Sequence, residues 1–246
     1  KPIKITSVDS TGKGVFVLNS AEKSILENIN FDNLSSTSKH GWKLTSAITF
    51  YESDVAINNC IFSNNRDGDD YLNVIRSDFE INNTIFNNIN ADAIDSDFSS
   101  GKVVNSSFFN CANDAIDISG SKVEINNIYI ENVGDKGISV GENSLVSANN
   151  IKIINAEIGI CSKDMSTITV KNAYLDDNEI GLTAFQKKSE YGPANIIGFD
   201  IEFNNVTIQY LVETFSELKI DGEIQQTKNL NIKELLYGVK YGKNNN

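Results

Sequence analysis

Apolar and polar residues alternate in short runs along most of the chain, for example in residues 123–130. A period of two predicts β-strands that bury one face. The runs are rich in β-branched and aromatic residues, and asparagine, glycine, aspartate and serine separate them, as expected for strands joined by tight turns. No long stripe with a helical period occurs before residue 227. The pattern therefore predicts an all-β chain.

A small residue followed by an apolar one returns at a constant interval of 22 residues. The small residues are Ala93, Ala115, Gly137, Gly159 and Gly181, and the apolar residues after them are Ile94, Ile116, Ile138, Ile160 and Leu182. A repeat of this length built from short strands is typical of a β-solenoid, in which each turn buries its apolar face against the next. The leucine ladder of a leucine-rich repeat is absent.

A second marker, an asparagine followed three places later by an apolar residue, runs through the same units. It begins at Asn28, Asn59, Asn83, Asn127, Asn150 and Asn172, and Ser106 replaces the asparagine in one unit. Strands of successive turns lie about 4.8 Å apart, so equivalent residues form columns along the coil. We therefore expect the isoleucine column to point into the core and the asparagines to form hydrogen-bond ladders at the turns.

The repeat predicts one parallel β-helix of about nine turns over residues 1–226. Residues 35–43, 66–70 and 185–195 interrupt the period and are predicted to be loops. The repeat is lost in residues 227–246, which we expect to form a C-terminal cap or tail, because the open end of a solenoid needs a cover.

Composition narrows the range of partners. The 246 residues carry a net charge of −12, which argues against nucleic acid and anionic membrane surfaces as partners and favours cation binding or an extracellular setting. No apolar run approaches the roughly 20 residues that cross a bilayer, so no membrane insertion is expected. The three cysteines show neither disulfide-framework nor zinc-site spacing.

Aspartates recur at the same interval as the isoleucines. Asp70, Asp92 and Asp114 form one column that Lys136 continues, and Asp95 and Asp117 form the neighbouring column. Both columns should point out of the coil. Stacked like charges destabilise paired strands, so the stack requires a bound cation, a neutralising lysine or a protonated carboxyl group.

Carboxylate oxygens at this spacing suit calcium better than a transition metal. The predicted calcium ligands are Asp70, Asp92, Asp95, Asp114 and Asp117. A calcium-dependent polysaccharide lyase would use Lys136 as general base beside Asp114 and Asp117. A hydrolase would instead use two aspartates as acid and base.

Four further residues are candidates to bind an anionic glycan, namely Lys163, Lys187, Lys188 and Tyr191. His40 and Trp42 offer either a stacking platform for sugar or an anchor for their own loop. The alternative to every one of these sites is a solvated acidic face whose aspartates cap backbone N–H groups at tight bends.

Residues 15–222 resemble the right-handed parallel β-helix superfamily of pectate lyases, polygalacturonases and alginate or chondroitin lyases. Asp92-Ala-Ile-Asp95, Asn113-Asp-Ala-Ile-Asp117 and Gln186-Lys-Lys are similar to strings in a β-helix module of bacterial surface proteins. That module is often joined to lamin-tail-like or spore-coat-kinase-like domains. The resemblance implies an extracellular or cell-surface domain of a larger multidomain chain, and it assigns no catalytic residues.

The motifs of the characterised enzymes are missing. Polygalacturonases carry Gly-His-Gly and pectate lyases carry Trp-Ile-Asp-His, whereas the sole histidine and tryptophan of this sequence are His40 and Trp42. We therefore expect a polysaccharide-interacting domain with an acidic, calcium-loaded face, with or without lyase activity. The alternative is a non-catalytic structural or adhesive module. An enzyme should show a groove and a lysine with a strongly shifted pKa beside the aspartates, whereas a spacer should show a flat face.

Overall fold

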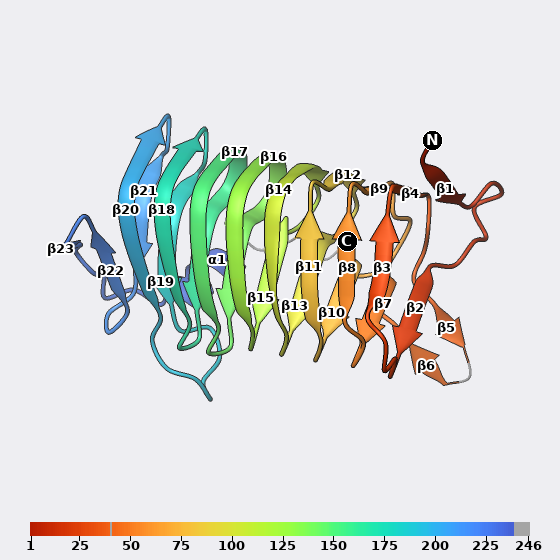
Figure 1. Ribbon diagram of the computed structural model, residues 1–246. Helices are drawn as coiled ribbons and strands as arrows, with labels where there is room; N and C mark the ends of the chain where they lie inside the picture. Colours follow the sequence, from red (N-terminus) through yellow and green to blue (C-terminus); the bar gives the residue numbers. More distant parts are fainter. Residues whose placement is uncertain (40, 239–246) are drawn as a thin grey trace.

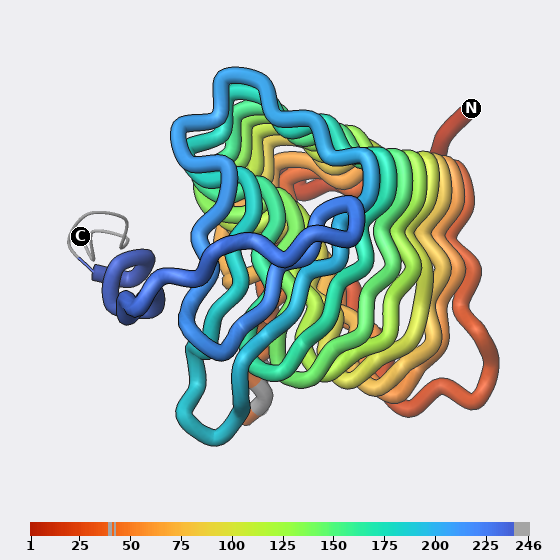
Figure 2. Tube along the Cα trace, turned by 90° about the vertical axis from the view of Figure 1, so that its left-hand side faces the viewer, coloured from red at the N-terminus to blue at the C-terminus, as the bar shows by residue number. Residues whose placement is uncertain are grey.

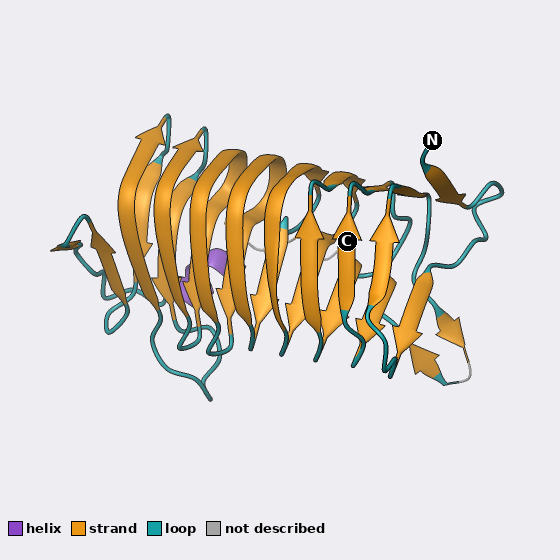
Figure 3. Cartoon of the chain, in the orientation of Figure 1, coloured by secondary structure: helices purple, strands orange, loops and turns teal. Residues whose placement is uncertain are grey.

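The computed structural model describes residues 1–39 and 41–238, and it is a parallel β-solenoid of about ten turns (Figures 1 and 3). Viewed along its axis, the chain winds as a right-handed coil (Figure 2). The predicted fold is confirmed, with one turn more than the estimate of about nine. α1, Ile232–Tyr237, is the only helix in the described ranges, and no described helix has the length and apolar character needed to cross a membrane.

Three parallel sheets run along the coil. The first contains β2 (Val15–Leu18), β7 (Ser46–Tyr51), β10 (Asp70–Ile75), β13 (Asp92–Asp97), β15 (Ile116–Ser119), the later parts of β16 (Lys122–Gly141) and β17 (Leu145–Lys163), β19 (Ile180–Phe185) and β21 (Ile208–Val212). The second contains β3 (Ser24–Glu27), β8 (Val55–Asn58), β11 (Asp78–Asn82), the first parts of β14 (Ser100–Cys111), β16, β17, β18 (Thr167–Asp176) and β20 (Asn195–Asn204), and β22 (Glu217–Ile220).

The third sheet begins with β1 (Ile3–Thr6), β4 (Ile29–Asp32), β9 (Ile61–Ser63) and β12 (Ile85–Ile89) and continues through the later parts of β14, β18 and β20 and the middle parts of β16 and β17. Two antiparallel pairs complete the described strands: β5 (Ser38–Lys39) with β6 (Trp42–Lys43), and β22 with β23 (Glu223–Ile224).

The predicted isoleucine column lies in the core. Its members pair in register through five turns and are each at most 1% exposed: Ile94, Ile116, Ile138, Ile160 and Leu182. A phenylalanine stack fills another side of the interior, with centroid distances of 4.7–5.0 Å between Phe31, Phe62, Phe86 and Phe108. Stacked rings at this spacing bury apolar area and add specific ring–ring attraction.

The small residue of each repeat is required by close packing between turns. A Cβ on Gly159 would lie 2.7 Å from the carbonyl oxygen of Gly181, and a Cβ on Gly137 would meet the carbonyl oxygen of Gly159 at the same distance. Such contacts are shorter than packed atoms tolerate. The bend therefore admits only the smallest residues, as the repeat predicts.

Asparagine ladders occupy the turns, as expected. The amide of Asn127 donates to Asn105 at 3.0 Å, and Asn150 donates to Asn127 at 2.9 Å. These asparagines have positive φ near 50–55°, a conformation that asparagine tolerates better than most residues. In this turn the ladder residue is Asn105. The prediction that Ser106 takes the place of the asparagine was therefore wrong by one residue. Phe108 stacks on Phe86 and pairs with it in register, so the apolar residue of this unit is Phe108 and not Phe109.

The C-terminal segment does not simply cover the end of the coil. Residues 225–231 cross the last turn, and α1 then lies against the outer side of the first sheet (Figure 2). Ile232 and Leu236 of α1 join an apolar cluster on that side, which also contains Ile158, Cys161, Ile180, Phe185 and Leu211. The helix begins at Asn231, whose side chain accepts a hydrogen bond from the backbone N–H of Glu234.

Candidate functional site

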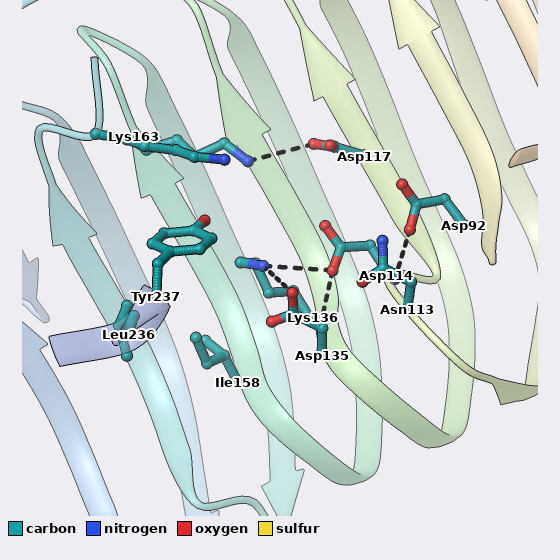
Figure 4. Close-up of a pocket in the computed structure, with 11 residues that line it drawn as sticks. Asp92, Asn113, Asp114, Asp117, Asp135, Lys136, Ile158, Lys163, Leu236 and Tyr237 are labelled. Carbon is teal, nitrogen blue, oxygen red and sulfur yellow. Dashed lines mark hydrogen bonds and ion pairs between the residues drawn. The ribbon is translucent and has the colours of Figure 1, made fainter. Parts of the chain in front are cut away.

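A pocket of about 250 Å³ lies on the outer side of the first sheet, where α1 packs against the coil (Figure 4). Its walls come from four successive turns, from the 186–194 loop and from α1. The residues around it are Asp92, Asn113, Asp114, Asp117, Asp135, Lys136, Ile158, Lys163, Lys187, Leu236 and Tyr237. The pocket therefore gathers most of the residues that the sequence analysis selected.

Backbone hydrogen bonds fix the first acidic column. Asp92 Oδ1 accepts from the backbone N–H of Asp114 at 2.8 Å, and Asp114 Oδ1 accepts from the backbone N–H of Lys136 at 3.0 Å. The three residues leave the coil interior, as expected, but they are only 8%, 3% and 3% exposed. They are therefore buried and do not form a solvated face. Each carboxylate does cap the next turn, as the structural alternative expects.

Two buried lysines neutralise the carboxylates. Lys136 Nζ lies 3.5 Å from Asp114 Oδ1 and 2.6 Å from Asp135 Oδ2. Lys163 Nζ lies 3.6 Å from Asp117 Oδ1 and donates to Ser139 Oγ at 2.7 Å.

Lys163 reaches back along its own column only because Gly141 leaves space. A Cβ at Gly141 would come within 2.7 Å of Lys163 Cε. The lysine that pairs with Asp117 thus depends on a glycine one turn earlier.

The carboxylates of the pocket differ in protonation. Burial raises the pKa of Asp92 to about 9, and the charges of Asp114 and Asp117 act in the same direction. Burial also acts to raise the pKa of Asp117, but the ammonium groups of Lys163 and Lys136 outweigh it and hold that pKa below its usual range. At neutral pH Asp92 is therefore a neutral acid, and Asp117 is a carboxylate.

The pKa of Lys136 is raised. Burial alone would lower it, but the carboxylate of Asp114 outweighs burial and raises the pKa well above the usual lysine value. This is the direction that the charge pattern predicts, and it opposes a role as general base.

Three of the five predicted calcium ligands come together. Asp92, Asp114 and Asp117 each offer one oxygen atom, and these atoms lie within 4.8 Å of one another. Asp70 instead accepts from Thr45 Oγ1 at 3.1 Å, and Asp95 accepts from Asn73 Nδ2 at 2.9 Å. Because Lys136 and Lys163 already neutralise two members of the triad, the calcium hypothesis rests on these three aspartates in competition with two ammonium groups.

The predicted glycan-binding residues separate into two groups. Lys163 and Lys187 line the pocket, whereas Lys188 forms an ion pair with Glu142 and Tyr191 is not among the residues around the pocket. Asp164 Oδ1 holds the start of the loop by accepting from the backbone N–H groups of Lys187 and Lys188, both at 2.7 Å.

Lys187 has the opposite electrostatic character to Lys136. Burial lowers the pKa of Lys187, and the ammonium groups of Lys163 and Lys136 lower it further. Its Nζ lies 4.4 Å from the ring centroid of Tyr237. The strongly shifted lysine pKa values of the pocket belong to Lys136 and Lys163 and are raised, whereas Lys187 is the pocket lysine whose pKa is lowered, the direction that a general base needs.

Tyr237, Leu236 and Asp135 line the pocket but were not predicted from the sequence. Tyr237 and Leu236 come from α1, and Asp135 precedes Lys136 at a register shift between β16 and β17. The apolar spacing of Ile232 and Leu236, together with the cap at Asn231, was the available signal for a helix that packs on a surface. His40 lies outside the described residues, and the backbone of Trp42 forms part of β6.

Comparisons with known proteins identify the fold. No protein-family model matches the chain, and a search of curated proteins gives no match. Among solved structures, the chain is similar to a variant catalytic domain of a GH87 alpha-1,3-glucanase in complex with nigerose, with a TM-score of 0.52 and 13% identity. The match covers 90% of this chain and 56% of that chain, so the protein spans about half the length of the glucanase domain.

Two further similarities to solved structures are weaker. A second GH87 alpha-1,3-glucanase catalytic domain with nigerose gives a TM-score of 0.46 at 12% identity, with the same coverage. Tailspike protein 2 of the Escherichia coli O157:H7 bacteriophage CAB120 gives a TM-score of 0.42 at 11% identity, over 89% of this chain and 42% of that chain.

Proposed function

We propose that this domain binds a polysaccharide in the pocket beneath α1. The observation that carries the proposal is the pocket itself, in which four aspartate side chains, one of them a neutral acid, and three lysine ammonium groups surround a cavity edged by the ring of Tyr237. Saccharides present many hydroxyl groups and an apolar ring face, so they suit a site with convergent polar groups beside an aromatic ring. A flat spacer face would offer no such enclosure.

The fold comparison supports this proposal. The GH87 alpha-1,3-glucanase structure with a TM-score of 0.52 contains nigerose, a saccharide, on a related coil. A polysaccharide ligand also fits the extracellular or cell-surface location that the sequence suggests, and we propose that location with it.

Binding by a Tyr237→Ala variant tests the proposal. Wild-type protein should bind at least one polysaccharide in affinity electrophoresis and calorimetry, and Tyr237→Ala should weaken that binding about tenfold because the aromatic surface is removed. Tyr129→Ala is a matched control, because Tyr129 lies on the outer surface of the third sheet, away from the pocket. Absence of binding to every glycan would favour the structural or adhesive module instead.

A second candidate function is glycoside hydrolysis, favoured by the difference in pKa between Asp92 and Asp117. A neutral acid beside a carboxylate is the arrangement that divides the acid and nucleophile roles in glycosidases. Asp92 would donate a proton to the leaving oxygen, and Asp117 would attack the anomeric carbon to form a glycosyl ester. The Asp92 carboxylate would then take a proton from water, which attacks the anomeric carbon and releases Asp117. The approach of their oxygens to within 4.8 Å is closer to the spacing of retaining enzymes than of inverting enzymes.

Release of reducing ends from bound polysaccharide tests hydrolysis. Asp92→Asn and Asp117→Asn should each abolish release while retaining binding. The lyase reaction predicted from the sequence, with Lys136, Asp114 and Asp117 as catalytic residues, stays a prediction. It would produce new unsaturated uronate ends, and their appearance would reveal it. Binding without either product would establish a binding module and reject both reactions.

A further inference from the structure

Three lysines reach the pocket, but only two have a carboxylate partner. Lys136 and Lys163 pair with aspartates, whereas Lys187 forms no ion pair with any residue between 1 and 238 that the structure describes. The nearest recorded partner of its ammonium group is the ring of Tyr237, 4.4 Å from the centroid. A half-buried ammonium group beside two other cations is destabilised unless an anion joins it.

The carboxylate of Asp117, in the same pocket, lacks a hydrogen-bond donor. Asp117 Oδ1 is buried and accepts no hydrogen bond within the described chain. Lys163 Nζ, at 3.6 Å, is close enough for electrostatic attraction but too far for a hydrogen bond. A buried acceptor without a donor costs free energy that a ligand hydroxyl can recover.

We infer that the pocket selects an acidic sugar unit, whose carboxylate is received by Lys187 and whose hydroxyl group donates to Asp117. This inference rests on the proposed polysaccharide binding and names the class of its ligand. A neutral sugar would satisfy Asp117 but leave Lys187 without an anion. A uronic acid unit satisfies both groups at once.

The size of the pocket limits how much of the ligand it encloses. A cavity of about 250 Å³ lies below the range of roughly 300–1,000 Å³ typical of sites that enclose a drug-sized molecule. The pocket therefore encloses one sugar unit and not a long stretch of polymer. Discrimination between acidic and neutral polysaccharides would thus be made at a single unit.

The test compares each acidic ligand with its methyl ester, which keeps the sugar but removes the charge. The probes are short oligosaccharides of pectate, alginate and hyaluronan, measured by calorimetry. Wild-type protein should bind at least one acid form about tenfold more tightly than its ester, the loss expected when a hydrogen bond to a charged group is removed. Lys187→Gln should remove this preference while still binding the ester.

Two variants separate recognition from general effects of charge. Lys188→Gln removes a neighbouring positive charge that is already paired with Glu142, and it should keep the preference. Lys187→Arg should also keep it, because an arginine retains the cation. Equal binding of acid and ester by wild-type protein, or a preference that survives Lys187→Gln, overturns the inference. Binding of neutral glycans alone overturns it while sparing the proposed function, and no binding at all contradicts both.

Proton uptake gives an independent readout. The groups that face Lys187 are Lys163, Lys136, Asp117, Cys161 and Tyr237. Because the first two lower the pKa of Lys187, a bound carboxylate should raise that pKa and draw a proton from the buffer at alkaline pH. The binding enthalpy should then depend on the buffer's ionisation enthalpy for wild type but not for Lys187→Arg. An equal dependence in both proteins would overturn the role of Lys187.

Discussion

The outer surface of the first sheet changes character halfway along the coil. One column runs from Ser46 through Asp70, Asp92 and Asp114 to Lys136, and continues as Ile158 and Ile180. The apolar half is covered by α1, whereas the acidic half lies beyond the helix. The pocket forms where the two halves meet, since Ile158 packs in one apolar cluster with α1 and Lys136 lies 5.6 Å from the ring centroid of Tyr237.

The difference shows how a repeat can create a site. Every residue of a solenoid lies next to its equivalent in adjacent turns, so an apolar column stabilises itself through contacts between like residues. A charged column does not, because like charges repel. In this column the repulsion between like charges ends where aspartate is replaced by lysine and then by isoleucine. The candidate chemistry lies at that change.

The interior column is common to both halves, and breaking it should have the largest effect. Ile138→Asp places a carboxylate at a site with no exposed surface and should cost roughly 4 kcal/mol or more. Chemical denaturation should show unfolding or a large fall in midpoint. Ile138→Val is the matched control and should cost about 0.5–1.5 kcal/mol. A folded Ile138→Asp protein of near wild-type stability would contradict the core assignment.

Lys136 lies at the boundary between the halves, and removing its charge should have the next largest effect. Lys136→Met leaves Asp114 buried without its cation and should cost about 3–5 kcal/mol, since both side chains are 4% exposed. The double variant Lys136→Met with Asp114→Asn should recover part of that loss because no buried charge is left unpaired. Equal losses in the single and double variants would show that the ion pair is not the cause.

The repeat made the coil predictable, but it could not predict which residues outside the coil complete the pocket. A period of 22 residues identifies which residues share a column, and so Ile138, Asp114 and Lys136 were placed correctly relative to one another. Tyr237 belongs to no column, and its contact with Lys187 depends on how a helix and a loop outside the repeat fold back. The repeat also gave no sign that Asp92 is buried, since it shows which residues share a column and not how exposed they are.

The acid group of the pocket should make stability depend on pH. The pKa of Asp92 is raised to about 9 in the folded protein, so its contribution is fully present below the unfolded pKa near 3.8 and is lost as pH rises through 9. Stability should therefore decline between pH 5 and pH 9. Asp92→Asn removes this titration, and its melting temperature relative to wild type should rise over that interval, by about 2–4 °C for each kcal/mol. A constant difference across the interval would contradict a protonated Asp92.

Calcium should have the smallest effect, and it decides how the acidic half is neutralised. If the triad of Asp92, Asp114 and Asp117 binds calcium with the millimolar-range affinity of weak protein sites, 10 mM calcium should stabilise the folded state by about 1–3 kcal/mol. The melting temperature should then rise relative to protein in EDTA, and Asp114→Asn should remove the rise. The lysines act against this binding, because a divalent ion among the aspartates would approach Lys136 and Lys163. Identical melting curves in calcium and EDTA would mean that these two lysines and the protonated Asp92 neutralise the stack without a metal.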